Sequence, residues 1–287
     1  MCKKIGVRRR FLMLAGTTMR ILARTDFRGL AVMIVALLAV PAVAVAQTDE
    51  IQVYDGNIAG RGVFNLTLHN NFTPVGLHAQ AFPGGLVPDK SFNGVSEWAY
   101  GVTDWFEAGL YLPLYSISKD RGATINGGKL RLLFTRPHAA EHTFFYAINF
   151  EFSYNATHWN SRRFTSEIRP IIGFHLHPVD IIVNPILDNS YIGGFKALDF
   201  APATRIAYNV SPKWALAVEE YADLGPLNHF FSESEQSHQI YAVIDHPNKF
   251  FNIEAGIGFG LTSASDKVTL KLILSRDLHS FNDDRKP

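Results

Sequence analysis

Cysteine, charge and long apolar runs are all scarce in this sequence. The 287-residue chain has one cysteine, Cys2, so it can form no internal disulfide. Charged residues make up 18% of the chain, below the roughly 25% of an ordinary soluble domain. This composition argues against a disordered chain and against a nucleic-acid-binding one.

The first 46 residues have the three parts of a secretory signal peptide. Eight Lys/Arg stand against one acid, Asp26; an apolar block covers 29–40; and a small-residue series ends in Ala44-Val45-Ala46. We expect cleavage after residue 46, with translation beginning at Met1 or Met19; an N-terminal membrane anchor is the alternative. Removal of residues 1–46 leaves a cysteine-free chain with 19 bases and 25 acids, a net charge of −6.

No later apolar run approaches the roughly 20 residues of a membrane helix. The best candidate, residues 170–187, is interrupted by histidines, prolines and Asp180. Any membrane span must therefore be made of strands. The expected organisation is a signal peptide at 1–46, a periplasmic N-terminal segment at 47–62, a transmembrane barrel at 63–278 and a C-terminal tail at 279–287.

Apolar residues after position 62 alternate with polar ones in segments of about ten residues, a pattern typical of half-buried strands. In residues 144–154 one face is wholly apolar or aromatic, and the other is mostly small or polar. Twelve such segments occur, an even number, as in closed antiparallel barrels of bacterial outer membranes. They are 63–72, 94–102, 106–115, 128–135, 144–154, 164–176, 181–188, 195–208, 214–223, 238–245, 250–260 and 268–276.

The connections between these segments alternate in length. Short turns follow every second segment, and several of the others are long, at 73–93, 117–127, 156–163 and 224–237. This asymmetry favours an outer-membrane up-and-down barrel over a soluble sandwich, the alternative reading of the alternation. Aromatics beside the short turns predict a belt at the lipid–water boundary; its members are Trp105, Phe106, Phe144, Tyr146, Trp214 and Phe251.

The run from Glu97 to Tyr111, EWAYGVTDWFEAGLY, reads as a strand, a tight Thr-Asp turn and a second strand. This hairpin resembles one that recurs in the bacterial outer-membrane barrels grouped as transporters of the phenol meta-degradation pathway type. The resemblance implies a porin-like barrel that passes small aromatic or other hydrophobic compounds. It carries over no catalytic residue, and this chain differs from the pattern in running past Leu278 into a tail.

If the apolar faces meet lipid, the opposite faces line a lumen with charges of both signs. This mixed ladder predicts no single-sign filter, and it leaves open whether the lumen conducts or is filled. The predicted lumen-lining residues are Glu97, Glu107, Lys129, Arg131, Asn149, Glu151, Glu167, Arg169, Asp199, Arg205, Glu219, Glu254 and Lys271.

Prolines inside the predicted strands are the main observation against them, because proline cannot donate to a ladder. Besides Pro113, three lie on consecutive segments: Pro170, Pro185 and Pro202. One hypothesis is that the wall bends or is unpaired there and offers hydrophobic solutes a lateral exit. A harmless bulge near the rim is the alternative.

Three function classes remain: a passive channel for small solutes, an outer-membrane lipid hydrolase, and a non-conducting structural or soluble binding barrel. The channel is favoured, because neither G-x-S-x-G nor H-E-x-x-H occurs. We expect no cofactor and no metal site; His175, His177 and Asp180 are the best metal candidates. Expected partners are outer-membrane lipid, an unidentified solute and, during biogenesis, the barrel assembly machinery, with no nucleic acid.

Overall fold

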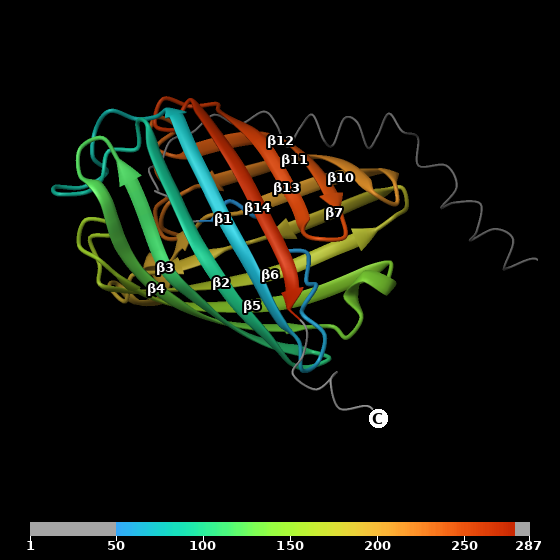
Figure 1. Ribbon diagram of the computed structural model, residues 1–287. Helices are drawn as coiled ribbons and strands as arrows, with labels where there is room; N and C mark the ends of the chain where they lie inside the picture. Colours follow the sequence, from blue (N-terminus) through green and yellow to red (C-terminus); the bar gives the residue numbers. More distant parts are fainter. Residues whose placement is uncertain (1–49, 279–287) are drawn as a thin grey trace, which may run out of the picture. The chain divides into compact units, whose positions relative to one another are not determined.

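The computed structural model describes residues 50–278, which form one closed antiparallel β-barrel (Figure 1). The expected signal peptide at 1–46 and the tail at 279–287 lie outside the described residues. The strands are β1 (Phe64–Val75), β2 (Ser91–Thr103), β3 (Phe106–Ser118), β4 (Gly122–Thr135), β5 (Phe144–Asn155), β6 (Phe164–His175), β7 (Val179–Asn184), β8 (Leu187–Asn189), β9 (Asp199–Phe200), β10 (Ala203–Ser211), β11 (Trp214–Asp223), β12 (Ser237–Pro247), β13 (Asn252–Gly260) and β14 (Val268–Leu278).

These fourteen strands occupy twelve positions in the wall, which we call staves. β7 and β8 together form one stave, and β9 and β10 together form the next. Each stave pairs with its neighbours in the sequence, and β1 pairs with β14 to close the wall. The prediction of an all-β up-and-down barrel of about twelve strands is therefore confirmed. Two short 3-10 turns, η2 (Ala139–Glu141) and η3 (Gly194–Ala197), lie in connections. Within residues 50–278, no helix has the length and hydropathy to cross a membrane.

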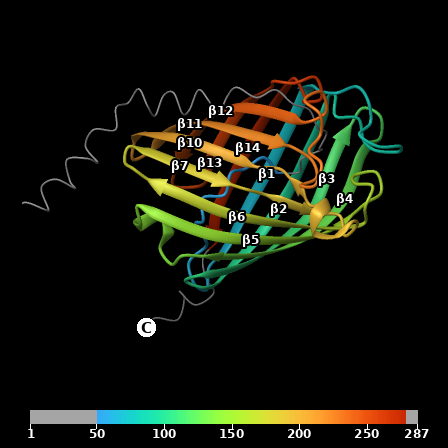
Figure 2. The ribbon, with the colours of Figure 1, turned by 180° about the vertical axis from the view of Figure 1, so that it is seen from behind.

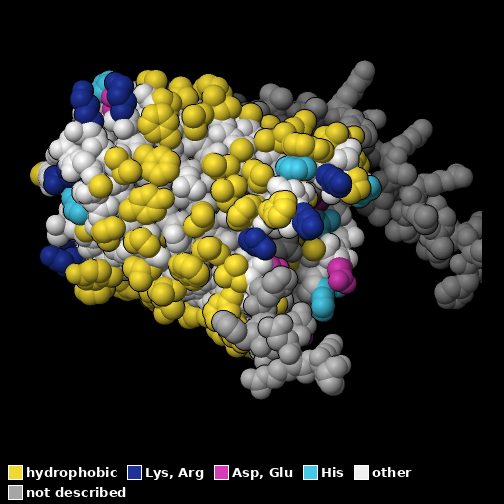
Figure 3. Space-filling model, in the orientation of Figure 1, with side chains coloured by type: hydrophobic (Ala, Val, Ile, Leu, Met, Phe, Trp, Pro, Cys, Tyr) yellow, Lys and Arg dark blue, Asp and Glu magenta, His cyan; other side chains and the backbone are white. Residues whose placement is uncertain are grey.

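The alternation of the sequence is an alternation between the outside and the inside of the barrel. On β14, Leu270 and Leu272 are exposed on the outer surface, whereas Thr269 and Lys271 between them are buried inside. Figure 3 shows hydrophobic side chains over the middle of the visible face, with charged side chains gathered toward its two ends. An apolar exterior around a polar interior is the arrangement of a barrel in lipid.

One connection was predicted wrongly. Residues 117–127 are not a long loop: β3 continues to Ser118 and β4 begins at Gly122, which leaves a tight turn. The glycines of the Gly122–Gly128 stretch resemble a loop in sequence, yet Gly127 and Gly128 pair in register with Asn155 and Tyr154 of β5. The predicted long loops at 156–163 and 224–237 are present, and the first one spans 76–90.

The prolines lie where the ladder is irregular. Pro113 sits at a register shift between Tyr111 and Leu114, on both the β2 and the β4 side. The pairing of β6 with β7 and β8 places Pro170 opposite Pro185. The pairing of β7 with β10, and of β8 with β9, places Pro185 opposite Pro202. We call these three the proline row. β7 and β8 are separated at Pro185, and β9 and β10 at Pro202.

The lipid-facing surface can be tested at the centre of β11. Val218 is 50% exposed on the outer face. In phospholipid vesicles, Val218→Arg should lower the free energy of unfolding by about 2–4 kcal/mol, the cost of a cation at the bilayer midplane. Leu227, 45% exposed in the loop after β11, is the control. Equal losses for Val218→Arg and Leu227→Arg would contradict a lipid-facing β11.

Candidate functional site

The barrel interior is filled in its middle by the chain's own N-terminal residues. Residues 50–62, which we call the plug segment, run through the lumen to β1, and Ile51, Val53, Tyr54 and Ala59 are buried there. The sequence analysis assigned residues 47–62 to a periplasmic segment. In the structure, residues 50–59 lie inside the barrel, whereas Gly60 and Arg61 are exposed and Arg61 bridges Gly101 of β2; residues 47–49 lie outside the described residues.

Backbone atoms of the plug segment are bound by side chains from distant strands. Tyr54 N donates to Asn184 Oδ1 at 2.7 Å, and Asn184 Nδ2 donates back to Tyr54 O at 3.0 Å. Ala59 N donates to Glu107 Oε2 at 2.6 Å, and Lys271 Nζ donates to Ile51 O at 3.2 Å. These bonds supply the partners that an extended segment inside a barrel would otherwise lack.

Tyr54 is the most heavily contacted side chain of the plug segment. Its ring lies between two guanidinium groups, with Arg169 Cζ 4.1 Å and Arg131 Cζ 5.3 Å from the ring centroid. Its hydroxyl bonds Tyr111, Glu50 and Glu151. Cation–π contacts strengthen away from water, so this tyrosine holds the segment to both sides of the lumen.

The lumen charges form ion-pair networks around the plug segment. Arg131 pairs with Glu97 at 2.9 Å and with Glu107; Arg169 pairs with Glu167 at 2.6 Å and with Glu50 at 3.2 Å. A third network joins Arg205 and Lys271 to Glu219 and Glu254, with Asp245 on Arg205. Lys129 pairs with Glu151 at 3.1 Å.

All thirteen residues predicted to line the lumen lie on inner faces of the staves. Lys129, Glu167, Asp199 and Glu254 are half-buried, and the other nine are buried: Glu97, Glu107, Arg131, Asn149, Glu151, Arg169, Arg205, Glu219 and Lys271. Their role in passage stays a prediction. The sequence analysis did not predict that the plug segment fills the lumen or that Asp245 lines it. The only sequence signal for the plug segment is the alternation of Ile51 and Val53 with polar residues, which is also typical of a strand.

One part of the inner wall is apolar, which the alternation did not predict. Phe145 of β5, Ile171 of β6 and Ile182 of β7 face inward and pack with Val53 and Tyr54 of the plug segment. Ile171 and Ile182 lie on β6 and β7, two staves of the proline row, and Phe145 lies on the neighbouring β5. These three strands are labelled in Figure 2. We call this surface the apolar inner wall; Phe145 on the nominally polar face of 144–154 was its only sequence signal.

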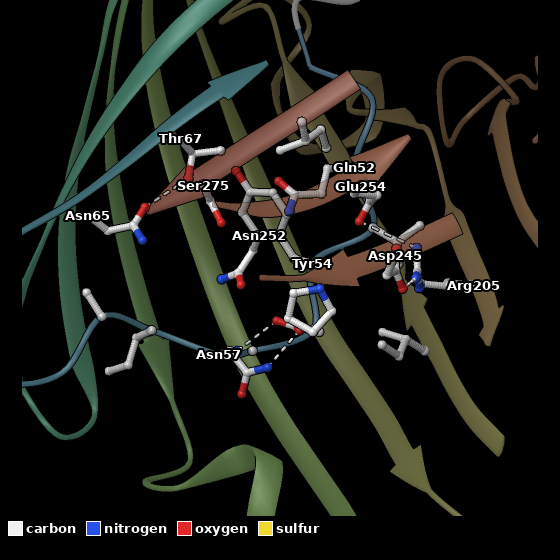
Figure 4. Close-up of a pocket in the computed structure, with 18 of the residues that line it drawn as sticks. Gln52, Tyr54, Asn57, Asn65, Thr67, Arg205, Asp245, Asn252, Glu254 and Ser275 are labelled. Atoms are coloured by element: carbon white, nitrogen blue, oxygen red, sulfur yellow. Dashed lines mark hydrogen bonds and ion pairs between the residues drawn. The ribbon is translucent and has the colours of Figure 1, made fainter. Parts of the chain in front are cut away.

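Two cavities remain in the lumen, one on each side of the plug segment. The short-turn cavity, of about 470 Å³, is lined by residues such as Asn65, Asn252 and Asp277 near the strand ends (Figure 4). The long-loop cavity, of about 550 Å³, is lined by Trp159, Asp188 and Asp266 among others. Gln52 borders both, so the plug segment stands between them.

Hydrogen bonds hold the first long loop in place beside the long-loop cavity. Leu77 N donates to Asp266 Oδ1 at 2.8 Å, and Gly76 N donates to Asp89 Oδ1 at 3.1 Å. The hydrogen bond from Gly76 lowers the pKa of Asp89, whereas burial raises the pKa of Asp266. The loop carboxylates therefore help to fix the first long loop.

The six predicted belt aromatics lie on the outer surface at the short-turn end. Trp105 contacts Phe106 and Phe134, with ring centroids 6.1 Å apart in both pairs, and Phe144 lies 5.1 Å from Phe174. Tyr146 and Phe251 are exposed, and Trp214 stacks on His246 at 4.1 Å. Their contact with a lipid boundary stays a prediction.

The residues considered for an enzyme are not assembled into a site. His175 Nδ1 bonds Asp180 at 2.7 Å, while His177 is exposed, and no group of three potential ligands in residues 50–278 could hold a metal. The His158 ring bonds Asn126, and His238 Nδ1 bonds Glu220. A barrel lipid hydrolase needs a histidine bonded to a serine, and the sequence offers His158 near Ser161 and His238 next to Ser237. Within residues 50–278, neither imidazole is hydrogen-bonded to that serine.

The fold is a closed twelve-stave barrel with an apolar exterior, the architecture of outer-membrane β-barrels, and the plug segment occupies its lumen. An outer-membrane channel of Pseudomonas putida F1 is similar, with 14% identity and a TM-score of 0.54 over 80% of this chain and 100% of that one. The KdgM porin has 8% identity and a TM-score of 0.49 over 75% and 99% of the two chains. No family model and no curated protein matches the sequence.

Substitution of Arg131 tests how much the buried ion pairs contribute to the stability of the barrel. Arg131→Met leaves Glu97 and Glu107, both buried, without their shared cation. The free energy of unfolding should fall by about 3–5 kcal/mol, as when one partner of a buried pair is removed. Lys90→Met, which breaks the exposed Asp89–Lys90 pair, should have no measurable effect. A similarly small effect for Arg131→Met would show that the network adds nothing.

Proposed function

We propose that this protein is an outer-membrane channel for small solutes with apolar or aromatic bodies, and that the plug segment closes it. The observation that carries the proposal is the apolar inner wall, whose contacts are occupied by Val53 and Tyr54. A solute that displaced these two side chains would find the same apolar contacts. The likeness to outer-membrane channels supports the fold that this function needs.

Passage requires the plug segment to move, since it stands between the two cavities. Each bond between its backbone and Asn184 contributes about 1 kcal/mol, each bond to Glu107 or Lys271 about 1.5–3 kcal/mol, and each cation–π contact of Tyr54 about 0.5–2 kcal/mol. The barrel wall, by contrast, is held by hydrogen-bond ladders between all neighbouring staves, with interruptions at Pro113 and at the proline row. The plug segment is therefore the part of the lumen that can yield without opening the wall.

Substitution of Tyr54 tests whether the plug segment closes the channel. Tyr54→Ala removes the hydroxyl bonds and both cation–π contacts, and should raise the plug-free population at least about tenfold, the effect of 1.4 kcal/mol. Single-channel recording in planar bilayers should then show more frequent or larger openings. Tyr54→Phe, which keeps the ring, should have an intermediate effect, and Tyr208→Ala, on the outer face, none. Unchanged currents in Tyr54→Ala would contradict closure by the plug segment.

The proline row supports a second step, the lateral exit of hydrophobic solutes into lipid. Pro185 has Pro170 on one side and Pro202 on the other, so three neighbouring staves lack N–H donors at the same level. The apolar inner wall lies behind the row, and Asn184, which holds Tyr54, precedes Pro185. Movement of the plug segment would therefore release contacts beside the weakest part of the wall.

Replacement of Pro170, Pro185 and Pro202 by Val restores the missing donors. Uptake of a hydrophobic solute into cells should fall, while potassium chloride conductance in bilayers stays the same. Pro113→Val, at the bulge of β3, is the matched control and should leave uptake unchanged. If the triple variant takes up the solute as the unmodified protein does, the lateral exit is wrong.

A further inference from the structure

We propose that the lumen selects solutes that combine an apolar or aromatic body with a positive charge over those with a negative charge. This inference rests on the proposed channel function and names the substrate class of the same lumen. It arises from the distribution of carboxylates around both cavities, which the mixed ladder of the sequence did not predict.

Both cavities are lined by more acids than bases. The long-loop cavity has seven Asp/Glu side chains against Lys129, Arg162 and Arg169. The short-turn cavity has seven Asp/Glu side chains against Arg131 and Arg205. The surplus has the same sign on both sides of the plug segment, so a solute meets a negative potential along the whole path.

Apart from Arg162, which is exposed, the bases that line the two cavities are engaged in ion pairs, and Lys129 pairs with Glu151. Arg131 and Arg169 each bridge two carboxylates, and Arg205 lies within ion-pair distance of three. Their positive charge is therefore neutralised locally, and little is left to attract an anionic solute. The carboxylates beyond these networks set the sign of the field in the open space.

Three surplus carboxylates stand together in the long-loop cavity: Asp188, Asp199 and Asp223. Asp188 and Asp199 face each other directly across β8 and β9. None of the three forms an ion pair with a Lys or Arg of residues 50–278. Like charges directly opposite each other are destabilising, and a cation between them would relieve that repulsion.

A second observation comes from the plug segment. Glu50 is 4% exposed and borders the long-loop cavity. Its Oε1 bonds Tyr54 and pairs with Arg169, whereas its Oε2 has no hydrogen-bond partner in the described chain. A buried carboxylate oxygen without a donor is costly, and its charge adds to the negative potential of the adjoining cavity.

The body of the solute would contact apolar side chains that border the same cavity as these carboxylates. Ile186 of the apolar cluster borders the long-loop cavity, as do Asp188 and Asp199. Apolar and acidic surfaces are therefore adjacent, and a compact aromatic cation can contact both. An aromatic anion of the same size would fit the apolar wall but would be repelled by the carboxylates.

The test uses two permanently charged probes with the same ring, phenyltrimethylammonium and benzenesulfonate. Reversal potentials of the full-length protein in planar bilayers, under bi-ionic conditions against potassium chloride, give their permeabilities. We expect phenyltrimethylammonium to be favoured by about fivefold or more, as a potential of a few kT predicts. Tyr54→Ala should keep this preference while it carries more current.

The triple variant Asp188→Asn, Asp199→Asn, Asp223→Asn should lower the ratio of the two permeabilities at least about twofold, since three charges leave the long-loop cavity. Amide side chains preserve size, and Asn at 223 keeps an oxygen for the bond from Gly225. The control neutralises three exposed carboxylates outside both cavities, by Asp120→Asn, Glu141→Gln and Glu233→Gln. Heat-modifiable migration on a denaturing gel verifies that each variant is folded.

The outcomes separate the two proposals. Equal or greater permeability of benzenesulfonate, or a ratio that the triple variant leaves unchanged, overturns the charge preference while the channel function stands. A folded protein that carries neither probe nor potassium chloride, even as Tyr54→Ala, overturns the channel function and this inference with it.

Discussion

The need to satisfy every backbone N–H and C=O within a membrane constrains all other parts of this structure. In hydrocarbon no water replaces a missing partner, so strands can cross only if the sheet closes on itself. The pairing of β1 with β14 achieves that closure. Once the wall is closed, outward side chains must be apolar and inward ones are free to be polar, which fixes the alternation along every stave.

The proline row and the plug segment are the two places where this rule is relaxed. The row removes donors from three adjacent staves, and the residues beside it, Arg169 and Asn184, turn to the plug segment: Arg169 Nη1 reaches Gln52 O at 3.3 Å. Apart from the bridge between Arg61 and Gly101 of β2, the backbone of the plug segment has no strand partner, and polar side chains of the wall bind it instead. The irregular wall and the irregular segment are thus held against each other.

The sequence indicated which side chains face outward and which face the lumen, but not what fills the lumen, for a physical reason. Period-two alternation is local, so Phe144–Asn155 could be recognised as a strand with one apolar face. The glycine-rich start of β4 was missed because its strand pairing depends on β3 and β5, not on local propensity. The plug segment was missed because its partners, such as Glu107, Asn184 and Lys271, are distant in the chain. The surplus of carboxylates likewise emerged only when the cavity linings were known.

The distances along the chain between the plug segment and its partners have a consequence for assembly. Its bonds join residues separated by 48, 130 and 220 positions, from Glu107 through Asn184 to Lys271. The plug segment precedes the wall in the chain, yet the most distant of its partners, Lys271, lies in β14, the last strand. It can reach its final place only when the barrel is nearly complete. The segment that comes before the barrel in the sequence is therefore among the last parts to reach its final position.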